Sequence, residues 1–158
     1  MNISFTFNGK SVTGEAAPRM TLVDFIRVVI KSTGTHVGCE HGVCGACTIV
    51  FNGQAIRSCL MLAVQANGHD VTTVEGLTQE DGTPGILQDA FRDAHGLQCG
   101  YCTPGMLTST HALLQTNPDP SDDDIKEAIG GNICRCTGYA QIIDSIKLAA
   151  KNLREASK

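Results

Sequence analysis

Eight cysteines, gathered in three short motifs, constrain this chain of 158 residues more than any other feature of its sequence. The motifs read GCEHGVCGAC with one further cysteine downstream, then QCGYCTPGM, and then NICRCTGY. Cysteine is less dense here than in small secreted proteins held by disulfides, and the N-terminus MNISFTFNGK has no pattern of an export signal. Cysteines at such spacings in a reducing compartment indicate metal binding or redox chemistry.

The first motif has the C-x4-C-x2-C spacing of plant-type [2Fe-2S] sites. The predicted ligands are Cys39, Cys44, Cys47 and Cys59. A loop can wrap such a compact anion only where side chains do not intervene, and Gly38, Gly42 and Gly45 meet that need. A structural zinc site is the alternative, but zinc sites usually pair two C-x2-C knuckles. His41 lies inside the loop as a possible Rieske-type ligand, although four cysteines already complete the site.

The other four cysteines form two pairs in separate loops and predict a second [2Fe-2S] site. Its predicted ligands are Cys99, Cys102, Cys134 and Cys136. Each pair is expected to precede a helix capped by Thr103 or Thr137, so that two positive helix ends would face an anionic cluster. Zinc would be compatible with this second set taken alone. The first motif favours a second cluster, because two adjacent clusters carry electrons further than one.

Hydrophobic alternation predicts that the first part of the chain is a small α+β domain. Asn8-Gly9 and Asn52-Gly53 are typical of tight turns between paired strands, and Thr21 with Asp24 is typical of a helix start. The expected strands cover residues 3–7, 11–13, 48–51, 54–58 and 71–74, and the expected helix covers 22–30. We assign residues 1–76 to this domain and the polar segment 77–85 to a linker.

The remaining residues, 86–158, predict a helical domain with four short helices. These are expected over residues 86–94, 106–115, 122–129 and 141–153. Ser121 with Asp124 forms a capping-box pattern at the third of them, which explains the acidic run there through the helix dipole. Four short helices joined by short loops indicate a bundle.

Charge and hydropathy narrow the classes of partner. The formal net charge is −4, with no basic patch suited to nucleic acid. No apolar run approaches the roughly 18 residues of a membrane span. The expectation is a cytoplasmic protein, without a membrane span or a nucleic-acid partner.

The three motifs, in this order and separation, closely resemble those of the small iron-sulfur subunit of the xanthine dehydrogenase family of molybdenum hydroxylases. The resemblance implies a β-grasp, ferredoxin-like domain followed by a four-helix bundle. It implies a heterotrimer in which a large subunit holds a molybdenum-pterin cofactor and a medium subunit holds FAD. Electrons would pass from molybdenum through the helical-domain cluster and then the ferredoxin-like cluster to the flavin.

The resemblance also marks two residues near the pterin, Gln98 as its hydrogen-bond partner and Cys136 as the cluster ligand nearest to it. It implies no catalytic residue in this chain, since the substrate site would lie on the large subunit. Two other functions stay open from the sequence. One is a free-standing two-cluster ferredoxin, and the other is a zinc-stabilised interaction module without redox activity.

Overall fold

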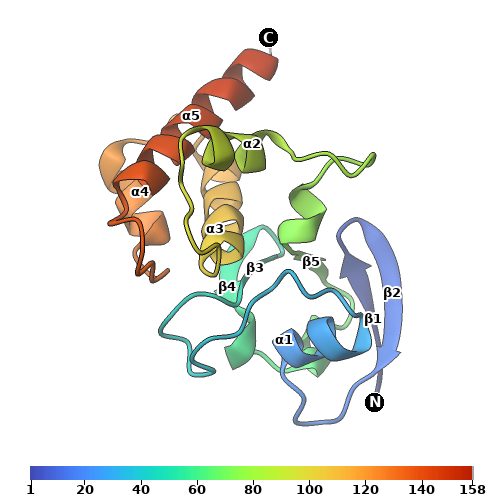
Figure 1. Cartoon of the computed structure of the whole chain (residues 1–158). Coiled ribbons are helices and arrows are strands. Elements are labelled where there is room, and N and C mark those ends of the chain that lie inside the picture. Colours follow the sequence, from blue (N-terminus) through green and yellow to red (C-terminus); the bar gives the residue numbers. More distant parts are fainter. Residues whose placement is uncertain (158) are drawn as a thin grey trace.

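Strands from the first half of the chain form one five-stranded sheet in the computed structural model, which describes residues 1–157 (Figure 1). The strands are β1 (Asn2–Phe7), β2 (Lys10–Glu15), β3 (Thr48–Phe51), β4 (Gln54–Arg57) and β5 (Asp70–Thr72). Their order in the sheet is β2-β1-β5-β3-β4. β1 runs parallel to β5, whereas the other neighbours are antiparallel.

Both predicted hairpins are confirmed, and local sequence explains them. In β1 buried and exposed residues alternate, so Ile3, Phe5 and Phe7 all face the core. The two turns contain Asn8-Gly9, with φ of 49° and 77°, and Asn52-Gly53, with φ of 48° and 83°. Positive φ at both central residues is the requirement of the turn that best matches the twist of paired strands.

The helix expected over residues 22–30 is only partly confirmed. Leu22–Asp24 (α1) is α-helical and begins as predicted, with the Asp24 amide donating to Thr21 Oγ1 at 3.2 Å. Phe25–Val29 continues as a wider π-helix, in which the amide of Ile30 donates to the carbonyl of Phe25. The β-branched residues in this stretch weaken α-helical propensity, and the wider turn keeps the adjacent Phe25 and Ile26 in the core.

The last predicted strand is also shifted, because β5 ends at Thr72 and Val74–Leu77 forms a short 3₁₀ helix. Two further 3₁₀ turns lie at Ser58–Leu60 and Ala63–Ala66. Glu75 explains the tight turn after β5, since its carboxylate accepts hydrogen bonds from Ser32 Oγ at 2.5 Å and from the Gly34 amide at 2.7 Å. This carboxylate therefore fastens the end of the sheet to the segment that leads into the first cysteine loop.

The second half of the chain contains the four predicted helices. They are α2 (Ile86–Asp93), α3 (Thr103–Thr116), α4 (Asp122–Ile129) and α5 (Ala140–Ala156). The capping box at α4 is confirmed, with the Asp124 amide donating to Ser121 Oγ at 3.2 Å. The ferredoxin-like sheet followed by a helical part agrees with the predicted fold class, while the limits 1–76, 77–85 and 86–158 stay a prediction.

Each half has its own hydrophobic core. The core beneath the sheet includes Phe5, Phe25, Ile26, Ile49 and Val71, and the helical core includes Phe91, Met106, Ile125, Ile142 and Ile146. The halves meet where α3 packs against β3, and Thr108 Oγ1 of α3 donates to the Thr48 carbonyl at 2.9 Å (Figure 1). In residues 1–157, none of the helices combines the length and apolar character needed to cross a membrane.

Candidate iron-sulfur sites

The structure brings the first four cysteines together at one end of the sheet, and we call this set the ferredoxin-domain site. It consists of Cys39, Cys44, Cys47 and Cys59. The β3–β4 hairpin returns the chain to the cysteine loop, where both the amide and the hydroxyl of Ser58 donate to the Cys47 carbonyl, at 3.3 and 2.7 Å. Cys59 therefore lies beside Cys47, as the sequence predicted from the hairpin.

Glycines shape the loop around this site. Gly42 and Gly45 have φ of +85° and +73°, values that L side chains rarely adopt. Gly38 approaches the site most closely, because a Cβ added there would lie 3.0 Å from Cys44 Sγ. The predicted need for glycine at these positions is thus explained by backbone geometry and by the space beside the sulfur.

The thiols of the ferredoxin-domain site fall into two pairs with different environments. The Cys44 amide donates to Cys39 Sγ at 3.4 Å and lowers the pKa of the Cys39 thiol to about 6. Burial raises the pKa of the Cys59 thiol to about 11, and its hydrogen bond with the Cys47 side chain acts in the same direction. Iron binds the thiolate form of cysteine. The lowered pKa of Cys39 favours that form, whereas Cys59 must lose a proton when it binds iron.

The last four cysteines converge in the same manner, and we call this set the helical-domain site. It consists of Cys99, Cys102, Cys134 and Cys136. Cys99 and Cys136 form an exposed outer pair, and the Tyr101 backbone lowers the pKa of the Cys99 thiol most, followed by the Cys136 side chain. Cys102 and Cys134 form an inner pair, and burial raises the pKa of the Cys102 thiol to about 12.

Thr137 and Tyr139 hold the loop that carries Cys134. The Thr137 hydroxyl lies 3.1 Å from Cys134 Sγ, and the Tyr139 hydroxyl accepts the Cys134 amide at 3.0 Å. Burial alone would raise the pKa of Cys134, but hydrogen bonds with the side chain and backbone of Thr137 bring about a net lowering. Tyr139 is not among the predicted site residues, although it lies within the motif NICRCTGY.

The prediction that two threonines cap the helices after the cysteine pairs is wrong. The N-cap of α3 is Cys102, and Thr103 Oγ1 is buried without a hydrogen-bond partner among the described residues. The N-cap of α5 is Tyr139, at a φ of +70°, two residues after Thr137. The Thr137 hydroxyl is used instead by the Tyr139 amide, at 3.1 Å, and by the cysteine sulfur.

The donor set of each site tests which metal these residues fit. Each set supplies four cysteine thiols, and within each set neighbouring thiols shift one another's pKa. In the part of the chain that the structure describes, no three His, Cys, Asp or Glu side chains converge at the spacing that one metal ion requires. Four thiolates, three of them in a glycine-containing loop with C-x4-C-x2-C spacing, are the donor set of a [2Fe-2S] cluster, so the residues of the ferredoxin-domain site fit that group.

Two other predicted residues lie at the edges of these sites. His41 is exposed, and its Nδ1 is 2.5 Å from the Cys39 carbonyl oxygen, so the imidazole interacts with the loop backbone. Gln98 is exposed and directly precedes Cys99, which is exposed too. The Gln98 side chain is thus available to a group outside this chain.

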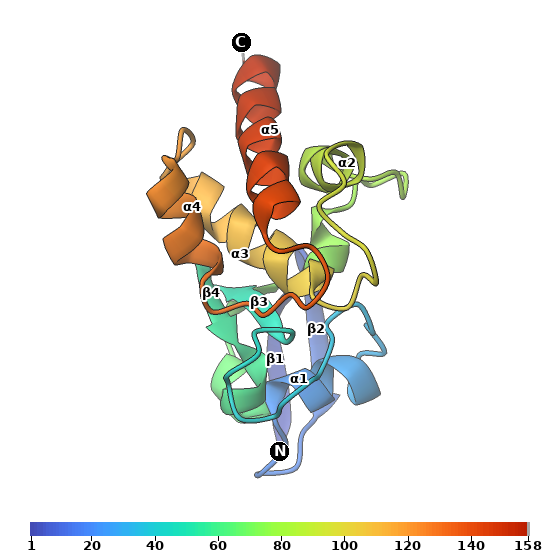
Figure 2. The same ribbon diagram turned by 60° about the vertical axis from the view of Figure 1, so that its left-hand side comes forward.

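The two sites are directly connected through the backbone. The amide of Ile133 donates to the carbonyl of Cys44 at 2.9 Å, which joins the residue before Cys134 to a cysteine of the other site. Tyr101 adds a second connection, because its hydroxyl donates to the Val37 carbonyl and its ring packs against His36. In Figure 2 the segment that leads from α4 to α5 runs down beside β3 and the loop before it.

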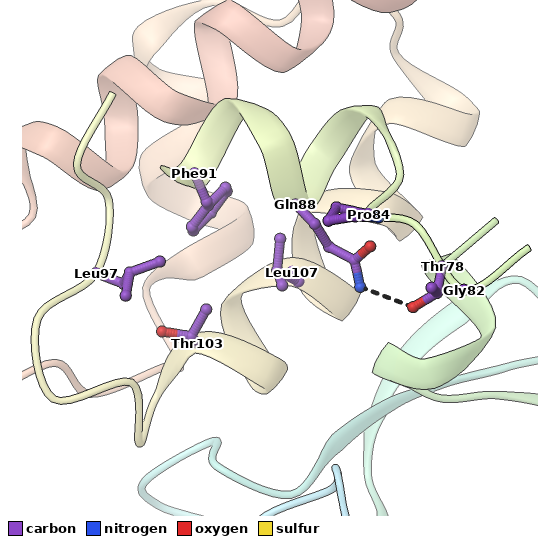
Figure 3. Close-up of a pocket in the computed structure, with 8 residues that line it drawn as sticks. All are labelled: Thr78, Gly82, Pro84, Gln88, Phe91, Leu97, Thr103 and Leu107. Atoms are coloured by element: carbon purple, nitrogen blue, oxygen red, sulfur yellow. Dashed lines mark hydrogen bonds between the residues drawn. The ribbon is translucent and has the colours of Figure 1, made fainter. Parts of the chain in front are cut away.

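A pocket of about 340 Å³ lies behind the helical-domain site, between α2 and the start of α3 (Figure 3). It is lined by Thr78, Gly82, Pro84, Gln88, Phe91, Leu97, Thr103 and Leu107. The Gln88 amide is already used, because Nε2 donates to Thr78 Oγ1 at 3.2 Å and Oε1 accepts from the Gly85 amide at 2.7 Å. These lining residues, all within the described range, include no thiol, imidazole or carboxylate to act as nucleophile, base or acid.

Comparison with known proteins identifies the family. The model of a 2Fe-2S iron-sulfur cluster binding domain matches residues 5–73, and that of a [2Fe-2S] binding domain matches residues 73–147. Caffeine dehydrogenase subunit gamma from Pseudomonas sp. (strain CBB1) is 55% identical over 148 residues, which are 92% of this chain and 88% of the relative. This chain belongs to the small [2Fe-2S] subunits of the molybdenum hydroxylases.

Solved structures of related enzymes agree with this assignment. The chain matches quinoline 2-oxidoreductase from Pseudomonas putida 86 with a TM-score of 0.94 and 50% identity, over 100% of this chain and 98% of the other. It matches the aldehyde oxidoreductase of Desulfovibrio desulfuricans with a TM-score of 0.93 and 37% identity, over 98% of this chain and 17% of that one. The small subunit therefore has two [2Fe-2S]-binding domains and belongs to an oxidoreductase complex, as predicted.

Proposed function

We propose that this small subunit carries electrons from a molybdenum-pterin cofactor on a large partner subunit to FAD on a medium partner subunit. The order proposed is the helical-domain site first and the ferredoxin-domain site second. The observation that supports transfer between the two sites is the 2.9 Å hydrogen bond from the Ile133 amide to the Cys44 carbonyl, because it shows that the two cysteine loops are in contact. Each bound [2Fe-2S] cluster supplies reversible uptake of one electron.

The eight cysteines are the proposed ligands, four in each site. The two matched family models, both of [2Fe-2S]-binding domains, and the four cysteines in each site support this assignment. Hydrogen bonds to the sulfurs stabilise the more negative, reduced form, and the chain supplies them from the Cys44 amide and the Thr137 hydroxyl. The start of α3 directly after Cys102 adds the positive end of a helix.

The outer pair of the helical-domain site is the proposed entrance for electrons. Cys99 and Cys136 are exposed, whereas Cys39 and Cys44, the more accessible cysteines of the other site, are only partly exposed. Gln98 directly precedes Cys99 and is exposed, and its amide suits a hydrogen bond to the pterin of the large subunit. Cys136 is the ligand proposed to lie nearest that cofactor.

Partner subunits follow from the same proposal, and we expect a cytoplasmic heterotrimer. The aldehyde oxidoreductase match supports a larger assembly, since 98% of this chain corresponds to only 17% of that single polypeptide. A free-standing ferredoxin would not need an exposed glutamine next to a second cluster. A zinc-stabilised module is disfavoured by the match of both halves of the chain to [2Fe-2S]-binding domains.

Purification of the complex tests the proposal. This chain would be tagged, coexpressed with the genes that flank its own, and isolated under mild conditions. We expect molybdenum, FAD and iron in a ratio of about 1:1:4, since two [2Fe-2S] clusters contain four irons. Addition of an oxidisable substrate should then bleach the iron-sulfur absorbance before the flavin is fully reduced. A complex with iron but without molybdenum or FAD would contradict the proposed partners.

A further inference from the structure

One buried side chain, that of Asn132, joins three segments of the chain at the contact between the two cysteine sites. Asn132 is 2% exposed and lies two residues before Cys134. Its Nδ2 donates to the Gly45 carbonyl at 3.0 Å and to Thr48 Oγ1 at 3.2 Å, and its Oδ1 accepts from Ser109 Oγ at 3.0 Å. The three partners belong to the first cysteine loop, to β3 and to α3.

The backbones around Asn132 approach one another too closely for side chains. A Cβ added to Gly45 would lie closer than 3.0 Å to the Gly131 carbonyl and to the Asn132 backbone. A Cβ added to Gly105, in the first turn of α3, would lie closer than 3.0 Å to the Gly45 carbonyl and to Asn132 Nδ2. The amide of Asn132 thus occupies a site from which other side chains are excluded, and its partners have fixed positions.

Arg57 completes the same network from β4. Its Nη1 donates to Thr48 Oγ1 at 2.8 Å, and its Nη2 donates to the Gly131 carbonyl at 2.6 Å. Thr48 is therefore the common acceptor of Asn132 and Arg57, and its own hydroxyl donates to the Gly45 carbonyl at 2.6 Å. The network connects the loop of the ferredoxin-domain site to that of the helical-domain site through side chains that are not proposed ligands.

The loop that follows Asn132 is held by the backbone on both sides. The Tyr139 hydroxyl donates to the Asn132 carbonyl at 3.3 Å and accepts the Cys134 amide at 3.0 Å. Between these two bonds, the Ile133 amide donates to the Cys44 carbonyl. A displacement of Asn132 would therefore move Ile133 and Cys134 relative to Cys44.

We propose that Asn132 is a positioning residue that fixes the distance and orientation between the two [2Fe-2S] sites. Its role is to hold the two ligand loops in one geometry, so that electron exchange between the sites has one rate in every molecule. It touches neither a substrate nor a proposed ligand sulfur. The proposal rests on the assignment of the cysteines as cluster ligands, but not on the direction in which electrons flow.

The magnetic interaction between the two reduced clusters measures this geometry directly. Two paramagnets couple through space with a strength that falls with the cube of their separation, so low-temperature EPR of the fully reduced complex shows splitting that depends on their positions. In Asn132→Ala we expect this splitting to be weakened or spread over a range of values. Iron content should remain at the wild-type level, and electron equilibration between the clusters should be slower and no longer single-exponential.

Two further variants make the test decisive. Thr48→Val keeps the volume of the side chain but removes the acceptor shared by Asn132 and Arg57, so it should change the splitting in the same direction. Thr48→Val decides the question if Asn132→Ala fails to retain iron. Asn117→Ala is the control. Asn117 Nδ2 donates a hydrogen bond to Asp124 Oδ2 at 3.2 Å, and neither residue belongs to a cysteine loop.

Wild-type splitting and wild-type equilibration in an iron-replete Asn132→Ala or Thr48→Val complex would overturn the positioning role. The failure of the underlying assignment would look different. If the reduced wild-type complex showed fewer than two cluster signals in EPR, the cysteine assignment itself would be wrong, whatever the variants showed.

Discussion

The Ile133 amide donates a hydrogen bond to the Cys44 carbonyl, with 2.9 Å between nitrogen and oxygen. These residues are far apart in the sequence, and each adjoins or belongs to a different cysteine site. Ile133 is also 52% exposed, so the connection runs along the surface of the contact rather than through its buried centre. This hydrogen bond joins the loop of the ferredoxin-domain site to that of the helical-domain site.

The metal content of the purified complex is the first prediction. We expect about four irons and four acid-labile sulfides per chain, and two distinguishable rhombic EPR signals after reduction. The signals should differ because Cys99 and Cys136 are exposed while Cys47 and Cys59 are buried. Metal analysis and EPR at low temperature measure both quantities. Stoichiometric zinc, or a single EPR signal with two irons, would show that one of the sites is not a cluster.

Thr137→Val should lower the midpoint potential of the helical-domain cluster. The Thr137 hydroxyl lies 3.1 Å from Cys134 Sγ and accepts the Tyr139 amide. A cluster-bound Cys134 thiolate has no proton, so in this contact the hydroxyl would be the donor. A hydrogen bond worth about 1 kcal/mol corresponds to about 40 mV for a one-electron couple. Redox titration followed by EPR measures this shift. Thr103→Val is the matched control, because Thr103 Oγ1 has no hydrogen-bond partner within residues 1–157. The midpoint potential of the helical-domain cluster should stay unchanged in that variant.

Gly45→Ala should destabilise the subunit much more than Gly53→Ala. Both residues have positive φ, which costs alanine roughly 1 kcal/mol, but only at Gly45 would a Cβ meet other atoms within 4 Å. We expect a loss of about 3 kcal/mol at Gly45 and about 1 kcal/mol at Gly53. In thermal unfolding of the assembled complex these losses correspond to decreases in Tm of roughly 6–12 °C and 2–4 °C. Equal decreases would mean that the close approach to Gly131 and Asn132 does not matter.

Much of the fold could be predicted because its signals are local. Asn8-Gly9 and Asn52-Gly53 specify their own turns, and the Ser121 capping box specifies the start of α4. The cysteine spacings within each loop are local too. These features depend on residues within a few positions of one another, and the structure reproduces them.

The features that the sequence did not reveal depend on contacts between distant residues. Asn132 and Gly45 are 87 positions apart, so their hydrogen bond has no local signature. Threonine is a common N-cap residue, which is why the sequence predicts Thr103 and Thr137 as caps. In the structure the Thr103 hydroxyl has no hydrogen-bond partner among the described residues, and the Thr137 hydroxyl contacts Cys134 Sγ. The π-helix at Phe25–Val29 likewise reflects packing against the sheet, which helical periodicity does not report.

Gln98→Ala should leave both clusters intact and impair the connection to the large subunit. The Gln98 side chain is exposed, so its removal should change neither iron content nor thermal stability. We expect substrate turnover or retention of the molybdenum cofactor to fall, because a hydrogen bond between subunits is lost. Gln115→Ala, at an exposed position near the end of α3, is the control. Wild-type turnover together with wild-type molybdenum content would show that Gln98 has no role in the contact with the large subunit.

The central claim concerns the order of the two sites, and Cys47→Ser separates them. Serine is a weak iron ligand beside thiolate, so the ferredoxin-domain cluster should be lost or its potential shifted. The four cysteines of the helical-domain site lie on other loops and should keep their cluster. Cys136→Ser is the complementary variant, since it should block electron entry and leave both the ferredoxin-domain cluster and the flavin oxidised.

The most direct measurement is rapid mixing of the assembled Cys47→Ser complex with substrate, after EPR has shown that the ferredoxin-domain cluster is absent. We predict that molybdenum and the helical-domain cluster are reduced within one turnover, and that flavin reduction then stalls. Flavin reduced at the wild-type rate in that same complex would contradict the proposed order of electron transfer.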